Sequence, residues 1–319
     1  MPKHPLRAPT YAYVIDSKSN PFHDVAMTDT HTTLYKSRAL CQKLEAQAQA
    51  NAKNLPSVCL AVVHVLGDKA SALYVQKKLA LAHKLGLKSK VSELPENVSQ
   101  AELEKTIKTY ADDEDVDGIL LQLPLPVSLD ALQALAYIPP AKDVDGLTLE
   151  NIGRLESAQS TYVKPNSPLP CTPLGIMRLL QSQQVAMTGK HAVVVGCSNL
   201  VGRPMATLLL QAGATVTRCH KKTAVLASHT RQADILVVAA GAKNLITPDH
   251  IKQGVCLIDV GIHVEDGHVV GDCQHDCAQK ASLQTAVPGG VGPLTVISLM
   301  TNTIDCAYRR RGHSTPNWL

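Results

Sequence analysis

Apolar runs of strand length alternate with amphipathic stretches along most of this chain of 319 residues, and that alternation restricts its fold. Strands that are separated by helices pair in parallel through right-handed connections, so we expect an α/β fold. In the first half the pattern predicts strands over 58–66, 88–94 and 118–123, and helices over 37–53, 71–85 and 129–138, with another helix opened by a capping box of Ser99 and Glu102.

A proline-rich segment, PNSPLPCTPLG at 165–175, interrupts this alternation. Its four prolines cannot all lie inside regular elements, although Thr172 and Pro173 suit the N-cap and first position of a new helix. After the break the pattern predicts strands over 191–195, 215–219, 234–240 and 255–261, and helices over 202–213, 223–232, 247–254 and 294–311.

We therefore predict two α/β lobes that join near residue 170. The first spans 32–170, and the second spans 171–293 and has a parallel sheet of the Rossmann type. The last helix could pack on either lobe, and we assign 294–319 to the first. Residues 1–31 are polar and irregular in pattern, and we treat them as an extension.

Charge and hydropathy exclude several classes of partner. The net charge of +4 is too small for a nucleic-acid surface, so we expect the arginine run 309–311 to be a solvated helix end. No apolar run approaches the length of a membrane span, and the N-terminus lacks the apolar core of a secretion signal. We expect a cytoplasmic protein that binds neither nucleic acid nor membrane.

The nine cysteines are scattered and lie mostly inside apolar runs, which is typical of reduced thiols in a reducing compartment. Cys273, His275 and Cys277 place three candidate ligands within five residues, but their spacing matches no usual zinc pattern. We therefore expect no metal.

Two adjacent lysines in the helix over 71–85 face different surroundings. At about 100° per residue, Tyr74 and Lys78 fall within the apolar stripe, and Lys77 falls on the polar arc. Burial favours the neutral form of an amine, so a lysine in that stripe needs a partner or a cleft. We predict that Lys78 is functional and that Lys77 is an ordinary solvated lysine. The alternative is that Lys78 reaches water at the edge of the stripe.

The segment 191–204, HAVVVGCSNLVGRP, is a buried strand that runs through a glycine-bounded turn into a helix, as in dinucleotide sites. The spacing from Gly196 to Gly202 is one residue longer than the common pattern and lacks its middle glycine. His220, Lys221 and Lys222 end the next strand, where NAD enzymes place an acidic residue. Cations there favour the 2′-phosphate of NADP, and the alternative is an ordinary basic loop.

Short-chain dehydrogenases also combine a nicotinamide site with a tyrosine and a lysine four residues apart. In those enzymes the glycine-rich turn opens the chain, and the pair follows it within the same domain. Here Tyr74 and Lys78 precede the turn and lie in the other lobe, which argues against that class.

Five motifs together resemble one family from about residue 32 to 308, namely the methylenetetrahydrofolate dehydrogenase/cyclohydrolase family. The motifs are ASALYVQKK, DGILLQLPLP, PPAKDVDGLT, PCTPLG leading to VVVGCSNLVGRP, and AVPGGVGPLT. The resemblance implies a homodimeric enzyme of one-carbon metabolism that serves purine biosynthesis. It would oxidise 5,10-methylenetetrahydrofolate with NADP⁺, with NAD⁺ as the alternative, and hydrolyse the methenyl product to 10-formyltetrahydrofolate.

The resemblance also implies roles for particular residues. Lys78, Tyr74, Gln122 and Asp145 would be catalytic, with Asp145 accepting the guanidine-like edge of the pterin and Tyr74 stacking on the folate. Alternatively, Asp143 and Asp145 only cap a turn before Gly146. Further substrate-binding residues would be Leu121, Leu123, Pro288, Gly289, Gly290, Val291, Gly292 and Pro293. The cofactor-binding residues would be Gly196, Cys197, Ser198, Val201, Gly202, Pro204, His220, Lys221, Lys222, Thr223 and Ile262.

Three departures from the family pattern bear on these expectations. Cys197 stands where the family often has arginine, and Lys221 where serine is common, so the cation for a 2′-phosphate has moved. Ala80 stands where a second lysine is common, which leaves the hydrolase step open. The alternatives are a dehydrogenase without cyclohydrolase activity and an idle dinucleotide-binding module.

Overall fold

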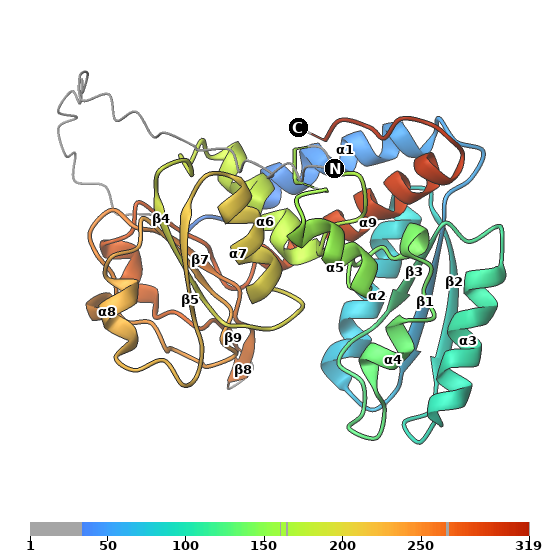
Figure 1. Cartoon of the computed structure of the whole chain (residues 1–319), viewed down its shortest axis with the longest axis horizontal. Helices are drawn as coiled ribbons and strands as arrows, with labels where there is room; N and C mark the ends of the chain where they lie inside the picture. Colours follow the sequence, from blue (N-terminus) through green and yellow to red (C-terminus); the bar gives the residue numbers. More distant parts are fainter. Residues whose placement is uncertain (1–33, 160, 164, 266–267, 319) are drawn as a thin grey trace, which may run out of the picture. The chain divides into compact units, whose positions relative to one another are not determined.

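The structure is a computed structural model that describes residues 34–159, 161–163, 165–265 and 268–318. The predicted extension over 1–31 lies outside the described residues. The described chain forms two α/β lobes with a parallel sheet in each, as predicted (Figure 1). One apolar cluster runs through both lobes, and the boundary near residue 170 stays a prediction.

Three parallel strands form the first sheet, in the order β2 (Lys88–Leu94), β1 (Cys59–Val65) and β3 (Gly118–Leu121). The helical elements of this lobe are α1 (Arg38–Ala52), α2 (Lys69–Lys84), α3 (Gln100–Asp112), α4 (Ala131–Leu135), η1 (Pro140–Lys142) and α5 (Leu149–Glu156). Every residue of β1 is buried because helices cover both faces of the sheet. Val62 belongs to the apolar cluster that contains Val75 of α2, whereas Val63 belongs to the one that contains Leu103 of α3.

Local side chains set where the helices of this lobe begin. Ser99 accepts a hydrogen bond from the backbone N–H of Glu102, as the capping box predicts. The predicted helix over 129–138 is shorter than expected. Asp130 caps α4 by accepting the N–H groups of Leu132 and Gln133, so the helix begins at residue 131 and extends only to 135.

Five parallel strands form the second sheet, in the order β10 (Leu283–Gln284), β7 (Cys256–Asp259), β6 (Ile235–Val238), β4 (His191–Val195) and β5 (Thr215–Cys219). Around it lie α7 (Gly202–Gln211), α8 (Leu226–Thr230) and the 3-10 turns η2 (Pro248–His250) and η3 (His275–Gln279). The predicted helix over 247–254 is therefore only the turn η2. An antiparallel hairpin of β8 (His263–Glu265) and β9 (His268–Val270) was not predicted.

The sheet of the second lobe is continued by a residue from the beginning of the described chain. Tyr35 donates its backbone N–H to the Gln284 carbonyl at 2.7 Å and accepts from the Ala286 N–H at 2.8 Å. Tyr35 also forms a parallel bridge with Thr285. The segment before α1 therefore ties the first lobe to the second.

Helices α6 (Cys171–Ser182) and α9 (Val291–Arg310) pack against each other. The start of α6 was predicted two residues late, because its N-cap is Pro170 and not Thr172. The predicted start of α9 was three residues late, so the GVGP part of the glycine-rich segment is its N-cap and first turn. As predicted, α9 returns to the first lobe, where it contacts α1, α2, β1 and β3.

The arginine run at the end of α9 is not a solvated helix end, so that prediction was wrong. Arg310 and Arg311 both form ion pairs with the fully buried carboxylate of Asp117, at 3.0 and 2.7 Å. Arg309 donates to the Pro165 carbonyl. Sequence alone could not show this, because Asp117 precedes the run by almost two hundred residues.

The nine cysteines are all free thiols, as predicted, and all are buried except the half-buried Cys197. Among the described helices, none combines the length and apolar character that crossing a bilayer requires.

Candidate active site

Lys78 of α2 and Gln122 at the end of β3 form a buried pair. Lys78 is 7% exposed, and its Nζ donates to Gln122 Oε1 at 2.9 Å. Gln122 is held in turn, because its Nε2 donates to the Leu123 carbonyl and its backbone N–H to the Val63 carbonyl. The predicted burial of Lys78 and its contact with Gln122 are confirmed. The amine is sheltered and has one neutral acceptor.

The rest of α2 explains why Lys78 points inward. Val75 and Ala82, on the same stripe, are buried, whereas Leu73 is exposed. Lys77 is exposed, as predicted. Its Nζ also lies 5.7 Å from the centroid of the Tyr74 ring, within the range of a cation–π contact, which the sequence did not indicate.

A small hollow brings residues of both lobes together around Lys78. Its volume is about 80 Å³, and it is lined by Lys78, Gln122, Leu123, Asp145, Leu147, Cys171, Thr172, Leu200 and Thr295. Leu200 belongs to the turn between β4 and α7, so the hollow reaches the nucleotide turn. Small-molecule sites usually measure about 300–1,000 Å³, so only the reacting end of a substrate fits here. Leu121, predicted to bind substrate, instead packs in the core cluster of α3.

Asp143 and Asp145 have different environments, although only one residue lies between them. Asp143 is buried and accepts from the Thr148 N–H at 2.8 Å and from Asn151 Nδ2 at 2.9 Å. Burial raises the pKa of Asp143. The turn-capping alternative therefore describes Asp143, while Asp145 lines the hollow.

Cys171 and Thr172 line the hollow, and the site residues predicted from sequence did not include them. Burial, with the neighbouring Asp145 carboxylate, raises the pKa of the Cys171 thiol well above its usual value. Cys171 is therefore a neutral thiol and no nucleophile at neutral pH. Thr172 shares a hydrogen bond of 2.9 Å with Thr295 of α9. In the sequence, the PCTPLG motif marks these residues only as a turn before a helix and does not indicate that they line a site.

Tyr74 lies beside the glycine-rich segment that precedes and begins α9. Burial raises the pKa of Tyr74, and its hydroxyl lies 3.6 Å from the position that a Cβ on Gly292 would take. Gly290 has no room for a Cβ, which would meet the Ala286 carbonyl oxygen at 2.5 Å. Of the predicted segment, Gly292 thus approaches Tyr74, Val291 is buried, Gly289 is half-buried, and Pro288 and Pro293 are exposed.

The turn between β4 and α7 is tight because its two glycines touch backbone. A Cβ on Gly196 would lie 2.2 Å from the Ala239 carbonyl oxygen, and a Cβ on Gly202 would lie 2.1 Å from that of Gly196. Ser198 Oγ accepts the Val201 N–H at 3.2 Å and the Gly202 N–H at 3.5 Å, which holds the turn against the start of α7. The turn residues 198–200 are exposed, and Pro204 is buried in α7. An exposed turn of this kind at a helix N-terminus suits a pyrophosphate.

In the loop after β5, some side chains hold the loop together by hydrogen bonds and others are exposed to solvent. His220 and Thr223 serve the loop itself, because Thr223 Oγ1 accepts the His220 N–H at 2.9 Å and His220 Nδ1 accepts the Lys222 N–H. Lys221 and Lys222 are exposed, and within the described residues neither ammonium has a carboxylate within 4 Å. Ile262, after β7, is exposed too.

Cys197 and Arg203 complete the surroundings of the turn. Cys197 Sγ donates to the Cys219 carbonyl. A thiol carries no positive charge, so Cys197 does not replace an arginine as a cation at this position. Arg203, which the sequence analysis did not single out, donates from Nε to the Cys197 carbonyl at 3.3 Å. Its place in the first turn of α7 could have been read from GRP.

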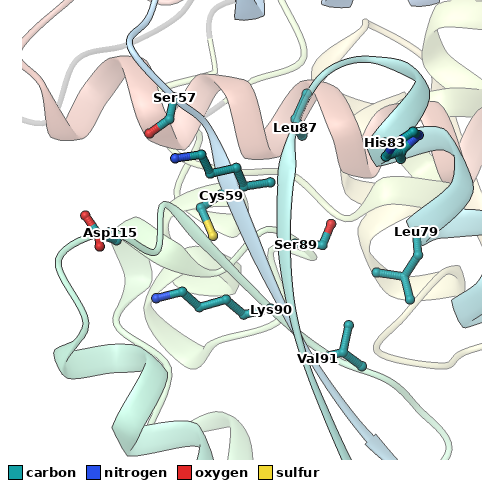
Figure 2. Close-up of a pocket in the computed structure, with 10 residues that line it drawn as sticks. Ser57, Cys59, Leu79, His83, Leu87, Ser89, Lys90, Val91 and Asp115 are labelled. Atoms are coloured by element: carbon teal, nitrogen blue, oxygen red, sulfur yellow. The ribbon is translucent and has the colours of Figure 1, made fainter.

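Two other features lie apart from this site. Cys273 and Cys277 are buried and His275 is exposed, and among the described residues no group of three or more His, Cys, Asp or Glu could hold a metal. A larger hollow of about 760 Å³ lies along β2, with Cys59, His83, Lys90 and Asp115 in its lining (Figure 2). None of the predicted site residues lines it.

The fold and the site define a two-lobed enzyme of the dinucleotide-binding α/β class. Residues 35–145 match the catalytic domain, and residues 170–311 the NAD(P)-binding domain, of the tetrahydrofolate dehydrogenase/cyclohydrolase family. The Bifunctional protein FolD of Neisseria gonorrhoeae is 48% identical over 265 residues, which cover 82% of this chain and 91% of that protein. The chain belongs to this family.

Two solved structures are similar over nearly their whole length. The bifunctional FolD methylenetetrahydrofolate dehydrogenase/cyclohydrolase of Campylobacter jejuni is 44% identical, with a TM-score of 0.83 over 87% of this chain and 99% of that one. The Trypanosoma brucei enzyme, complexed with NADP cofactor and an inhibitor, is 33% identical, with a TM-score of 0.83 over 89% and 99%.

Proposed function

We propose that this chain oxidises 5,10-methylenetetrahydrofolate to the methenyl compound with NADP⁺ and hydrolyses that compound to 10-formyltetrahydrofolate. The observation that carries the proposal is the buried Lys78–Gln122 pair, which shares one hollow with Asp145. Family membership and relatives that are named bifunctional support it.

In this proposal the first lobe orients the folate. Asp145 accepts two hydrogen bonds from the amino-pyrimidine edge of the pterin, a geometry that a carboxylate provides. Tyr74 stacks on the folate, and Gly292 leaves space above the Tyr74 hydroxyl. Because the hollow is small, it takes only the pterin edge at Asp145 and the bridge between N5 and N10 near Lys78, and the rest of the folate lies outside it.

The second lobe binds the dinucleotide. The exposed turn 198–200 and the N-terminus of α7 bind the pyrophosphate, and Lys221 and Lys222 bind the 2′-phosphate. Arg203 adds a cation beside Cys197, where the family often has arginine. The bound nicotinamide accepts a hydride from the methylene carbon. That transfer requires mainly alignment, since two nitrogens stabilise the cation left behind.

Lys78 moves the proton of the hydrolytic step. The Lys78 amine accepts a proton from water as the oxygen attacks the methenyl carbon between N5 and N10. The bond from that carbon to N5 then breaks, Lys78 returns the proton to N5, the hydroxyl on the carbon releases its proton to solvent as the C=O bond forms, and the formyl group stays on N10. Gln122 Oε1 holds Nζ in place for both transfers.

We propose further that the enzyme is a cytoplasmic homodimer that supplies one-carbon units for purine biosynthesis. Nine free thiols support a reducing compartment. Light scattering on the purified protein tests the dimer, and fractionation of the source cells tests the compartment.

The decisive experiment follows NADPH and methenyl absorbance separately in one assay of the purified protein. The proposal expects NADPH to form and the methenyl signal to stay low because it is hydrolysed. Accumulation of the methenyl compound would favour a dehydrogenase without hydrolase activity, the alternative that Ala80 raises. Absence of both signals would indicate an idle module.

A further inference from the structure

A second hollow, separate from the Lys78 site, lies between α1 and α6. Its volume is about 450 Å³, within the range of small-molecule sites. Its lining comes from the segment 35–43 and from 178–183: Tyr35, Lys36, Ala39, Leu40, Lys43, Arg178, Gln181, Ser182 and Gln183. Three of these residues are cations, and no acidic side chain is found among the described residues that line it. The positive charges of this lining therefore have no counter-charge within the lining itself.

Arg178 is the most unusual member of this lining. It is 5% exposed, yet its Nη1 donates only to hydroxyls, Ser298 Oγ at 3.3 Å and Thr301 Oγ1 at 2.9 Å. In the described part of the chain no carboxylate lies within 4 Å of it. A buried guanidinium without an anion is costly, and burial lowers the pKa of Arg178 to about 10.

Within the described residues, no carboxylate contacts Arg178 directly. Asp305 acts on Arg178 through its field, but its Oδ1 accepts the indole N–H of Trp318 at 2.9 Å and its Oδ2 lies 4.0 Å from Arg309 Nη2. The Trp318 ring lies on one side of the guanidinium, 5.9 Å from its carbon. Lys36 and Lys43, exposed on the other wall of the hollow, also have no carboxylate within 4 Å among the described residues.

We propose that this hollow binds a small oxyanion, through carboxylate or phosphate oxygens that bridge Arg178 to Lys36 and Lys43. A guanidinium matches such groups in a bidentate manner, and two lysines opposite it select for more than one negative charge. Gln181, Gln183 and the Tyr35 hydroxyl offer neutral donors around the same space.

The site lies next to the segment that the proposed function assigns to substrate. The Lys36 side chain passes 3.7 Å from the position of a Cβ on Gly289, and Ser37 donates its backbone N–H and its hydroxyl to the Gly289 carbonyl. Carboxylates could therefore come from the glutamate end of a bound folate or from a free polyanion. The first source rests on the proposed function, and the second does not.

The primary test measures anion binding without turnover. Inorganic phosphate and citrate are titrated into the full chain by calorimetry, with thermal shift in parallel. We expect binding that weakens roughly tenfold or more in the double variant Lys36→Met/Lys43→Met, since each charged hydrogen bond contributes substantially. Lys53→Met is the matched control, because Lys53 is an exposed lysine at the end of the same helix α1. Arg178→Lys is a second variant, which keeps the positive charge and loses the paired N–H donors of the guanidinium.

A second arm distinguishes the two sources. KM is measured for folate substrates with one and with several glutamates in the wild type, the double variant and the control. A KM that rises only for the longer substrate, with kcat unchanged, identifies the substrate tail as the anion. Lost phosphate and citrate binding with an unchanged KM ratio identifies a free anion. If neither binding nor KM ratio differs from Lys53→Met, the proposal is overturned, whatever the enzyme catalyses.

Discussion

The hollow around Lys78 and the turn between β4 and α7 differ in which atoms carry their proposed roles. In the first lobe these atoms belong to side chains, because an amine, an amide and a carboxylate line one hollow of about 80 Å³. In the second lobe they belong to the backbone, because Gly196 and Gly202 have no room for side chains. The charged groups there, Lys221 and Lys222, stay in solvent. Damage to the two regions should therefore affect the two reactions separately, and by different amounts.

The largest effect is expected from Lys78→Met, which removes the buried amine and keeps its length. Hydrolysis of the methenyl substrate should fall by about 10²–10⁴-fold, the usual contribution of a positioned proton carrier. Part of the hydride transfer should remain. Lys84→Met, at an exposed lysine of the same helix paired with Glu45, is the control. Equal loss or equal retention of both activities would contradict the role of Lys78.

The next largest effect is expected from Gly196→Ala, which places a Cβ against the Ala239 carbonyl at a backbone φ of 127°. Strain of this kind costs about 1–3 kcal/mol, and we expect kcat/KM for NADP⁺ to fall by roughly tenfold or more. Hydrolysis of supplied methenyl substrate should persist. In the described chain nothing crowds a Cβ built at Gly153, so Gly153→Ala is the control. A parallel fall of both activities would show that the lobes are not separable.

A moderate effect is expected from Lys221→Ser/Lys222→Ser. Because both ammoniums are exposed and screened, KM for NADP⁺ should rise by about 5–10-fold, while KM for NAD⁺ changes little. Steady-state kinetics with the two cofactors measures the ratio. Lys190→Ser, before β4 and hence at the opposite edge of the parallel sheet, should leave the ratio unchanged. An unchanged ratio in the double variant would remove these lysines from cofactor selection.

The smallest effect is expected from Lys77→Met. The contact of Lys77 with the Tyr74 ring is exposed, and such contacts contribute about 0.5–1 kcal/mol, or a two- to fivefold change. We expect that change in KM for the folate and none in kcat. In a Tyr74→Phe background the effect should persist, since phenylalanine keeps the ring. A larger fall in kcat would place Lys77 in the chemistry of the hollow.

Sequence predicted the regular part of the fold well where local signals decide it. The strands over 88–94, 191–195 and 215–219 match residue for residue, and so does the burial of Lys78. The periodicity of a helix or strand depends on neighbours within a few residues, which the sequence displays directly.

Among the charged residues, the sequence left one alternative open and made one clear error. Asp143 and Asp145 both precede Gly146, and only the folded loop, with the contacts of Asp143 to Thr148 and Asn151, shows which one is structural. The arginine run looked solvated because its partner Asp117 lies almost two hundred residues earlier in the chain. The size of the hollow could not be predicted, because it depends on how α6, α9 and the nucleotide turn meet.

Helix α9 affects the order in which the two lobes can fold during synthesis. It contacts α1, α2, β1 and β3, so these elements, which are synthesised early, cannot complete their packing until the late helix α9 has been synthesised. A nascent chain leaves part of the first sheet's surroundings uncovered until residues up to Arg310 have left the ribosome. The second sheet emerges earlier and already has Tyr35 available to continue it. During translation, the second sheet should therefore become protease-resistant before the first, whereas α6 is covered only once α9 has formed.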